Sequence, residues 1–142
     1  KEEFEENLSF MHGFRELIKR LKKNHYKVGL VTASPEHMFK WVNERLELTK
    51  FFEKIVYGGM TKKSKPHPDP YLLGMNLFNI KPQNTMIIED SVHGINAGLN
   101  SGAKVIALTG SVETNDMPPA HKIVNSLDEV DVRLINTMFK NT

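Results

Sequence analysis

Four side chains of this sequence have the chemistry to act together on a phosphate group and a hard cation. Thr32, Glu89 and Asp90 end short apolar runs, and Lys65 lies in the polar segment KKSKPHPDP. Carboxylate oxygens are the ligands that Mg²⁺ prefers in proteins. A lysine ammonium offsets the negative charge that develops during transfer of a phosphoryl group. These residue types therefore predict phosphoryl transfer around Mg²⁺.

Glu89 and Asp90 are adjacent carboxylates at the end of the apolar run MII. Adjacent like charges raise each other's pKa unless a cation or hydrogen-bond donors offset them. We therefore expect Glu89 and Asp90 to be ligands of Mg²⁺. An ordinary alternative stays open, because acids that precede Ser91 also complement the positive end of a helix.

The segment that follows the strand at Thr32 has the features of a phosphate site. The Thr32 hydroxyl and the backbone N–H groups of Ala33 and Ser34 precede a helix start, where N–H groups bind phosphate oxygens. We interpret Thr32, Ala33, Ser34 and Lys65 as phosphate-binding residues, with Thr32 and Lys65 also catalytic. Taken alone, Thr32 equally suits a turn cap or a strand, and Lys65 equally suits a solvated loop.

The elements that must position these residues follow from hydrophobic periodicity and turn signals. Helical spacing alternates along the chain with short β-rich apolar runs. We expect helices over 13–24, 35–46, 69–79, 92–101 and 127–138, and strands over 27–32, 54–58, 85–89, 103–108 and 122–124.

Alternation of strands with helices predicts an α/β fold with a mainly parallel sheet and helices on both faces. In such sheets, ligands bind beyond the carboxyl ends of the strands. Thr32 and the Glu89–Asp90 pair should therefore reach the same edge of the sheet, and the loop that holds Lys65 can reach it too. We further expect Ser91 to cap the following helix, and Gly94 and Gly98 to allow that helix to pack closely on the sheet.

Composition excludes several classes of function. The 142 residues suit one domain, with 39% hydrophobic and 25% charged residues and a net charge of +2, which is too weak to argue for nucleic acid. There is no cysteine, which excludes disulfides and thiolate metal sites and fits a cytoplasmic location. No apolar stretch approaches the roughly 20 residues that span a membrane. The basic run of Lys19, Arg20, Lys22 and Lys23 is interpreted as a solvated helix face.

Three stretches, VGLVTAS, SKPHPDPYLL and IIEDSVHGINAGLNSGA, occur in an order and at a spacing that resemble the haloacid dehalogenase superfamily. The subgroup that looks most similar contains beta-phosphoglucomutase and phosphoglycolate phosphatase-like enzymes. The resemblance covers residues from about 13 to 130. It implies a three-layer Rossmann-like fold and a Mg²⁺-dependent phosphatase or phosphomutase that acts on small phosphorylated metabolites.

The resemblance also implies roles for individual residues. Thr32 is similar to the residue that hydrogen-bonds the transferring phosphoryl group. Lys65 looks like the lysine that bridges the nucleophile and the phosphate, and Glu89 and Asp90 look like the acids that bind Mg²⁺, directly or through water.

One part of the family's pattern is missing from the sequence. The family's reaction begins at an Asp-x-Asp motif on a central strand, whose first Asp is the nucleophile. The nearest candidate, LDEVDV at 127–132, fits a helix and is rejected. Residues 1–12 are interpreted as the remnant of a cap or linker helix and 13–142 as a partial core domain, so we expect this chain to be inactive or nearly so.

The resemblance places the missing strand between the strand of Thr32 and the strand of Glu89 and Asp90. We expect these two strands to pair directly, to borrow a strand from another chain or a missing N-terminal segment, or to be only partly ordered. A second hypothesis for the function, from another class, is a noncatalytic module that keeps the fold for binding. The identity of the substrate, and the choice between phosphatase and mutase chemistry, stay open.

Overall fold

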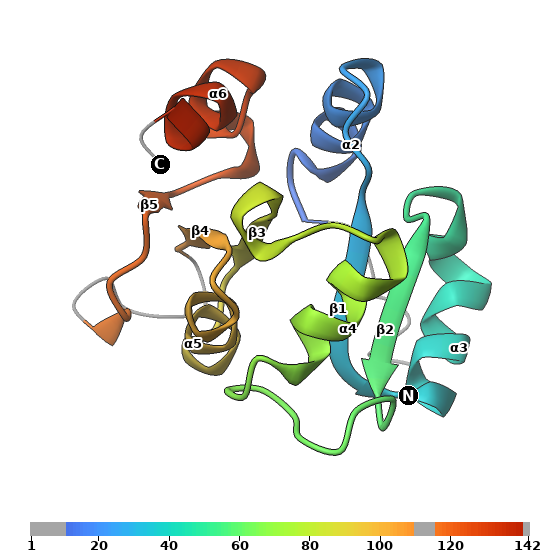
Figure 1. The fold of residues 1–142 in the computed structure, drawn as a ribbon. Helices are drawn as coiled ribbons and strands as arrows, with labels where there is room; N and C mark the ends of the chain where they lie inside the picture. The colour runs from blue at the N-terminus through green and yellow to red at the C-terminus, as the bar shows by residue number, and fades with distance from the viewer. Residues whose placement is uncertain (1–10, 110–115, 141–142) are drawn as a thin grey trace.

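The structure, a computed structural model, describes residues 11–109 and 116–140. Its strands form two parallel sheets (Figure 1). In the first, β1 (Gly29–Pro35) pairs with β2 (Lys54–Gly58). In the second, β4 (Lys104–Leu108) lies between β3 (Met86–Glu89) and β5 (Lys122–Val124). The predicted α/β class with parallel strands is confirmed.

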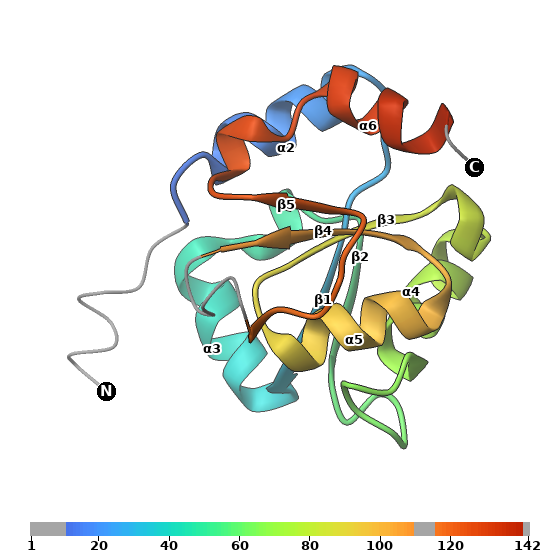
Figure 2. The ribbon, with the colours of Figure 1, turned by 90° about the vertical axis from the view of Figure 1, so that its left-hand side faces the viewer.

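Helices cover both faces of the strands and complete a three-layer arrangement. Figure 2 shows α2 and α6 on one side of the β3–β4–β5 sheet, with α4 and α5 on the other. Among the described residues, no helix is long and apolar enough to cross a membrane. The helices are α2 (Phe14–Lys23), α3 (Glu36–Leu46), α4 (Asp69–Phe78), α5 (Val92–Ser101) and α6 (Val132–Lys140), with short 3₁₀ turns η1 (Leu48–Lys50), η2 (Pro82–Asn84) and η4 (Leu127–Glu129).

The central strand β4 explains why its sequence is a continuous apolar run. Ile106 and Leu108 belong to the core under α2 and α6, whereas Val105 and Ala107 belong to the core under α4 and α5. A strand that is buried on both faces has no polar position to spare. The run VIAL therefore identifies the middle of the sheet.

Predicted and observed elements agree closely for β2, α5 and β5 and differ at two places. The strand predicted to end at Thr32 continues to Pro35, and its ladder with β2 jumps from Val31 opposite Val56 to Pro35 opposite Gly58. Pro35 then occupies the N-cap position of α3, so this helix begins at Glu36, one residue later than predicted.

The closing helix predicted over 127–138 is instead divided into η4 and α6. Two acids cause the division. Glu129 accepts hydrogen bonds from the backbone of Ser126 and completes a capping box, and Asp131 Oδ1 accepts one from the N–H of Leu134 at 2.8 Å to start α6. The acids of LDEVDV therefore cap helical turns, which agrees with their rejection as a catalytic strand motif.

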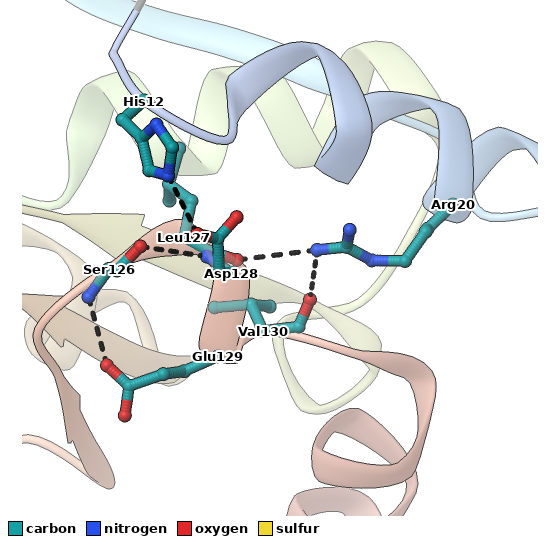
Figure 3. A network of polar contacts seen from close by, with 7 residues as sticks. All are labelled: His12, Arg20, Ser126, Leu127, Asp128, Glu129 and Val130. Atoms are coloured by element: carbon teal, nitrogen blue, oxygen red, sulfur yellow. Dashed lines mark hydrogen bonds and ion pairs between the residues drawn. The ribbon is translucent and has the colours of Figure 1, made fainter.

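A polar network ties the first described helix to the last segment of the chain (Figure 3). Arg20 of α2 donates through Nη2 to the carbonyl oxygen of Val130 at 2.9 Å and lies 3.4 Å from that of Leu127. His12 Nε2 lies 2.8 Å from Asp128 Oδ2. The interpretation of the whole basic run as a solvated face is therefore wrong for Arg20, because its guanidinium satisfies carbonyl groups that η4 leaves open.

Between the two sheets lies a cavity of about 510 Å³, called here the slot, whose lining includes residues of β1, β3, α2 and α4. Among the described residues, no strand lies between β1 and β3, and these two strands do not pair with each other. Of the outcomes expected at this place, direct pairing is therefore wrong. The two sheets are connected across the slot by helices α2 and α4, which line it.

We predict that Gly98→Ala in α5 lowers the free energy of unfolding by about 1–2 kcal/mol, because overpacking a rigid core outweighs the better helix propensity of alanine. A Cβ at Gly98 would lie 2.9 Å from Val105 Cγ2, in the middle of the sheet. Urea denaturation of the variant measures the change.

The matched control is Gly74→Ala in α4, where the nearest atom to a new Cβ is Val31 Cγ2 at 3.4 Å, an ordinary contact. This variant should be neutral or more stable by up to about 1 kcal/mol. Equal effects at the two glycines would contradict the explanation by close packing.

Candidate phosphate and metal site

A buried ion pair between Lys65 and Glu89 lies at the carboxyl end of β3. The loop before α4 brings the Lys65 ammonium to within 2.7 Å of Glu89 Oε2 at the end of β3. The same nitrogen donates to the carbonyl oxygen of Val31 in β1 at 3.1 Å. The two side chains are only 12% and 10% exposed, so the pair is shielded from solvent. One ammonium group thus joins Val31 of β1 to the carboxyl end of β3.

Tyr71, in the first turn of α4, completes this contact. Its hydroxyl donates to the same oxygen of Glu89, and the Lys65 nitrogen lies 5.0 Å from the centre of its ring. Burial, followed by the negative charge of Glu89, raises the pKa of Tyr71 above its usual range. The phenol therefore stays protonated and donates, and Glu89 accepts from two buried donors.

The first turn of helix α5 lies against the same carboxylate. A Cβ at Gly94 would collide with the carboxyl group of Glu89, so only glycine fits there. The predicted cap is confirmed, because Ser91 Oγ accepts from the N–H of Gly94 at 3.0 Å. The predicted close packing at Gly94 and Gly98 is confirmed as well. The positive end of α5 adds to the stabilisation of the carboxylate.

Sequence reasoning missed Tyr71, although it found Lys65 and Glu89. The stretch KPHPDPYLL gives no sign that its tyrosine faces a carboxylate 18 residues further along the chain. One sequence feature could have suggested this role for Tyr71. It is an aromatic residue in the first turn of an amphipathic helix, where burial is expected, and it follows Lys65 closely in the sequence.

Thr32, Ala33 and Ser34 lie in the part of β1 where its ladder with β2 is interrupted. The Thr32 hydroxyl accepts a hydrogen bond from the N–H of Ser34 at 3.1 Å, so this N–H is already used within the segment. Thr32 directly follows Val31, whose carbonyl oxygen contacts Lys65. Thr32 is thus the neighbour in sequence of a residue that binds Lys65, and Ser34 acts locally on Thr32.

The acids at the end of β3 offer oxygen ligands of the type that Mg²⁺ takes. Within residues 11–109 and 116–140, there is no group of three or more His, Cys, Asp and Glu side chains that could hold a metal ion. Mg²⁺ commonly keeps several waters and takes one or two carboxylates together with phosphate oxygens. Asp90, with the second oxygen of Glu89, fits that small donor set, whereas Glu89 Oε2 is engaged by Lys65 and Tyr71.

Comparison with known proteins extends this picture. The family model of haloacid dehalogenase-like hydrolases matches residues 1–108. A phosphorylated carbohydrates phosphatase of Thermotoga maritima is 33% identical over 106 residues, which are 75% of this chain and 49% of that protein. The pyrophosphatase PpaX of Bacillus mycoides is 30% identical over 115 residues, which are 81% of this chain and 54% of that protein.

Among solved structures, a putative beta-phosphoglucomutase from Thermotoga maritima superimposes with a TM-score of 0.83 at 27% identity, over 94% of this chain and 63% of that one. The chain therefore spans about half the length of the two curated relatives, and somewhat more of this structure. Because the family model matches most of the chain, and the fold agrees, this protein belongs to the haloacid dehalogenase-like hydrolases.

Proposed function

We propose that this chain forms the core of a Mg²⁺-dependent phosphatase or phosphomutase that acts on small phosphorylated metabolites. The observation that carries the proposal is the buried Lys65–Glu89 pair at the carboxyl end of β3, which also contacts Val31 of β1. Ligands of parallel α/β sheets bind at this edge. Membership of the hydrolase family supports it, as does the similarity to two relatives, a phosphorylated carbohydrates phosphatase and a pyrophosphatase.

In this proposal, Thr32, Ala33, Ser34 and Lys65 bind the phosphate group. The Thr32 hydroxyl and the N–H of Ala33 face the phosphoryl oxygens, and the Ser34 N–H orients the hydroxyl through the bond described above. Lys65 supplies a fixed positive charge for the transferring group. Fixing these donors before the reaction lowers the entropic part of the barrier.

Asp90, together with Glu89, is proposed to hold Mg²⁺. When bound there, the cation would polarise a phosphoryl oxygen and offset its charge. Glu89 has a second task, because it anchors Lys65 through Oε2. The buried Tyr71 hydroxyl supports that task by donating to the same oxygen of Glu89.

The 142 residues contain no Asp-x-Asp sequence on an apolar strand. We therefore propose that these residues bind phosphate and Mg²⁺ but need a nucleophile from elsewhere for catalysis, so that on their own they are inactive or nearly so. The same observation favours a second candidate, a noncatalytic module that retains the fold. The length and activity of the natural protein separate the two.

The first test is to isolate the natural protein, measure its mass, and follow Mg²⁺-dependent release of phosphate from a generic phosphate ester. For the enzyme, Lys65→Met should lower kcat by roughly two to three orders of magnitude, as does loss of a preorganised charge at other active sites. Lys63→Met, at an exposed lysine of the same loop, should leave kcat unchanged. A natural protein without any such activity would support the noncatalytic module instead.

Stability must be separated from chemistry in this test, because Lys65→Met leaves the buried carboxylate of Glu89 without its partner. We expect the single variant to lose about 3 kcal/mol of stability. The double variant Lys65→Met with Glu89→Gln should recover at least half of that loss and stay inactive. Recovery of activity together with stability would show that Lys65 only supports the fold.

The role of Asp90 is testable without a nucleophile. In residues 1–142, Mg²⁺ should tighten the binding of inorganic phosphate by at least about tenfold, since the cation bridges carboxylate and phosphate oxygens. Asp90→Asn should abolish this effect in a calorimetric titration. Glu53→Gln, an exposed acid just before the amino end of β2, should retain it. An unchanged Mg²⁺ effect in Asp90→Asn would exclude Asp90 as the ligand.

Tyr71→Phe removes one buried donor to Glu89 and should lower the free energy of unfolding by about 1–2 kcal/mol at pH 7. The pKa of Tyr71 is raised on folding, so the native state holds the proton more tightly than the unfolded state. The stability that this proton linkage provides is present below the unfolded pKa, near 10, and is lost as the pH rises above it.

Urea denaturation at a series of pH values up to 11 therefore should show a steeper alkaline loss of stability in the parent chain than in Tyr71→Phe. Tyr26→Phe is the matched control, because the Tyr26 hydroxyl makes only a 3.4 Å contact with Asn136 at the surface. Parallel pH profiles for the parent chain and Tyr71→Phe would contradict the assigned role of the buried phenol.

A further inference from the structure

The edge strand β5 begins with a hydrogen bond that a side chain, rather than the backbone, accepts. The Val105 N–H of β4 donates to His121 Nδ1 at 3.0 Å, and the His121 N–H donates to the carbonyl oxygen of Val105 at 3.0 Å. In a regular parallel ladder, both partners of Val105 would be backbone groups of the neighbouring strand. The imidazole of His121 therefore takes the place of a backbone acceptor at the start of β5.

The sequence just before β5 explains why a side chain is needed there. The regular ladder of β5 starts at Lys122, opposite Ile106, and Pro118 and Pro119 stand shortly before it. Proline has no N–H to donate to a ladder. Val105 is fully buried, so its N–H needs an acceptor that the backbone before His121 does not supply.

The bond exists in only one protonation state of the ring. A neutral imidazole has one nitrogen that accepts a hydrogen bond and one that carries a proton. Nδ1 can accept from Val105 only while the proton of the neutral ring is on Nε2. Protonation adds a hydrogen to Nδ1, and two donors then face each other at 3.0 Å. A buried N–H that loses its acceptor destabilises the arrangement that holds it.

The charges around His121 act in the same direction. Burial, followed by the positive charge of Lys104 in β4, lowers the pKa of His121 below its usual range. Lys122, the next residue of β5, is also basic, and Asp116 is the acid in the segment that leads to β5. Residues 94–101 of α5, which packs on the same part of β4, contain no titratable side chain. Protonation of the ring therefore opposes folding at this place.

The His121 contact secures a segment as well as one bond. Met117 and Ala120, just before β5, pack against the core that lies between the sheet and helices α4 and α5. At the other end of β5, the Thr109 N–H donates to the carbonyl oxygen of Val124 at 2.9 Å. Loss of the contact at His121 would thus free the amino end of β5 and the residues before it, while the carboxyl end stays paired.

We propose that His121 is a pH-dependent latch of β5: the neutral imidazole closes the ladder with β4 at Val105, and protonation opens this end of β5 together with residues 116–120. The stability that the latch provides is present above the unfolded pKa, near 6.5, and is lost as the pH falls through the lower folded value. Opening exposes part of the edge of β4, which is the central strand of its sheet. The inference does not depend on the proposed function.

His12 provides an internal contrast to His121. Its Nε2 lies 2.8 Å from Asp128 Oδ2, so its partner is an acceptor and protonation does not break the contact. Acid therefore acts in opposite ways on the two histidines that hold the last segment of the chain. Only the His121 contact requires the neutral ring.

The experiment follows hydrogen exchange of individual amides by NMR in residues 1–142 at pH 7.5 and pH 5, with rates corrected for the intrinsic effect of pH. Protection of the Val105 amide should fall by at least about tenfold at pH 5, because its acceptor is lost. The amide of Ile87, in the ladder between β3 and β4, should keep its protection. At pH 7.5, the ¹⁵N spectrum of the His121 ring should show a proton on Nε2 and none on Nδ1.

Two variants separate protonation of this ring from other effects of acid. His121→Asn offers an amide oxygen that accepts but does not titrate, so Val105 should stay protected at both pH values. His121→Leu removes the acceptor, so Val105 should exchange at least about tenfold faster at pH 7.5, with little further change at pH 5. His25→Asn is the matched control, because residue 25 is exposed and asparagine tolerates its positive φ of 66°. It should behave as the parent chain does.

Three results would overturn the proposal. A proton on Nδ1 of the neutral ring would contradict the assigned bond. Equal loss of protection at Val105 in the parent chain and in His121→Asn would show that acid acts through other groups. Loss at Ile87 as large as at Val105 would show general unfolding in acid. The assay contains neither phosphate nor Mg²⁺, so each of these results would leave the proposed function standing.

Discussion

The ammonium group of Lys65 holds together two sheets that share no ladder. It donates to Val31 within β1 of the first sheet and to Glu89 at the carboxyl end of β3 in the second. Buried charges persist only where partners satisfy them. Here the Glu89 carboxylate accepts hydrogen bonds from Lys65 and Tyr71 and lies against the first turn of α5. These partners explain why it can be buried. The candidate site therefore also connects the two sheets.

This double role shapes the interpretation of the two acids that end β3. Glu89 binds Lys65 and Tyr71 through one oxygen, whereas the neighbouring Asp90 contributes negative charge close to Tyr71. A pair of adjacent carboxylates thus has two different environments. Differentiation of this kind lets one member anchor a cationic side chain while the other serves a ligand.

Much of the architecture could be predicted from local sequence. The run KIVYG and the helix VHGINAGLNS have clear boundaries because glycine or a capping serine stands at their ends. The predictions failed where the decisive contact is between side chain and backbone. Helical periodicity continues through Val130, but capping by Glu129 and Asp131 divides the helix there.

The candidate site was predictable in part for a related reason. Lys65, Glu89 and Asp90 were found because their types are unusual beside apolar strands and because their order resembles a family pattern. The partnership of Tyr71 with Glu89, and the bond that turns Ser34 toward Thr32, depend on how loops close in three dimensions. Periodicity and composition carry no information about which side chains the loops bring into contact.

The division of the strands into two sheets has a consequence for local stability. Val31 and Thr32 belong to the unit built on β1 and β2, whereas Glu89 and Asp90 belong to the unit built on β3, β4 and β5. Segments joined by few hydrogen bonds open independently, with a smaller free-energy cost than global unfolding. The boundary between the two sheets runs through the candidate site. A transient opening that leaves both sheets folded would therefore take the site apart first, and whatever bridges the two units would set how often the site is assembled.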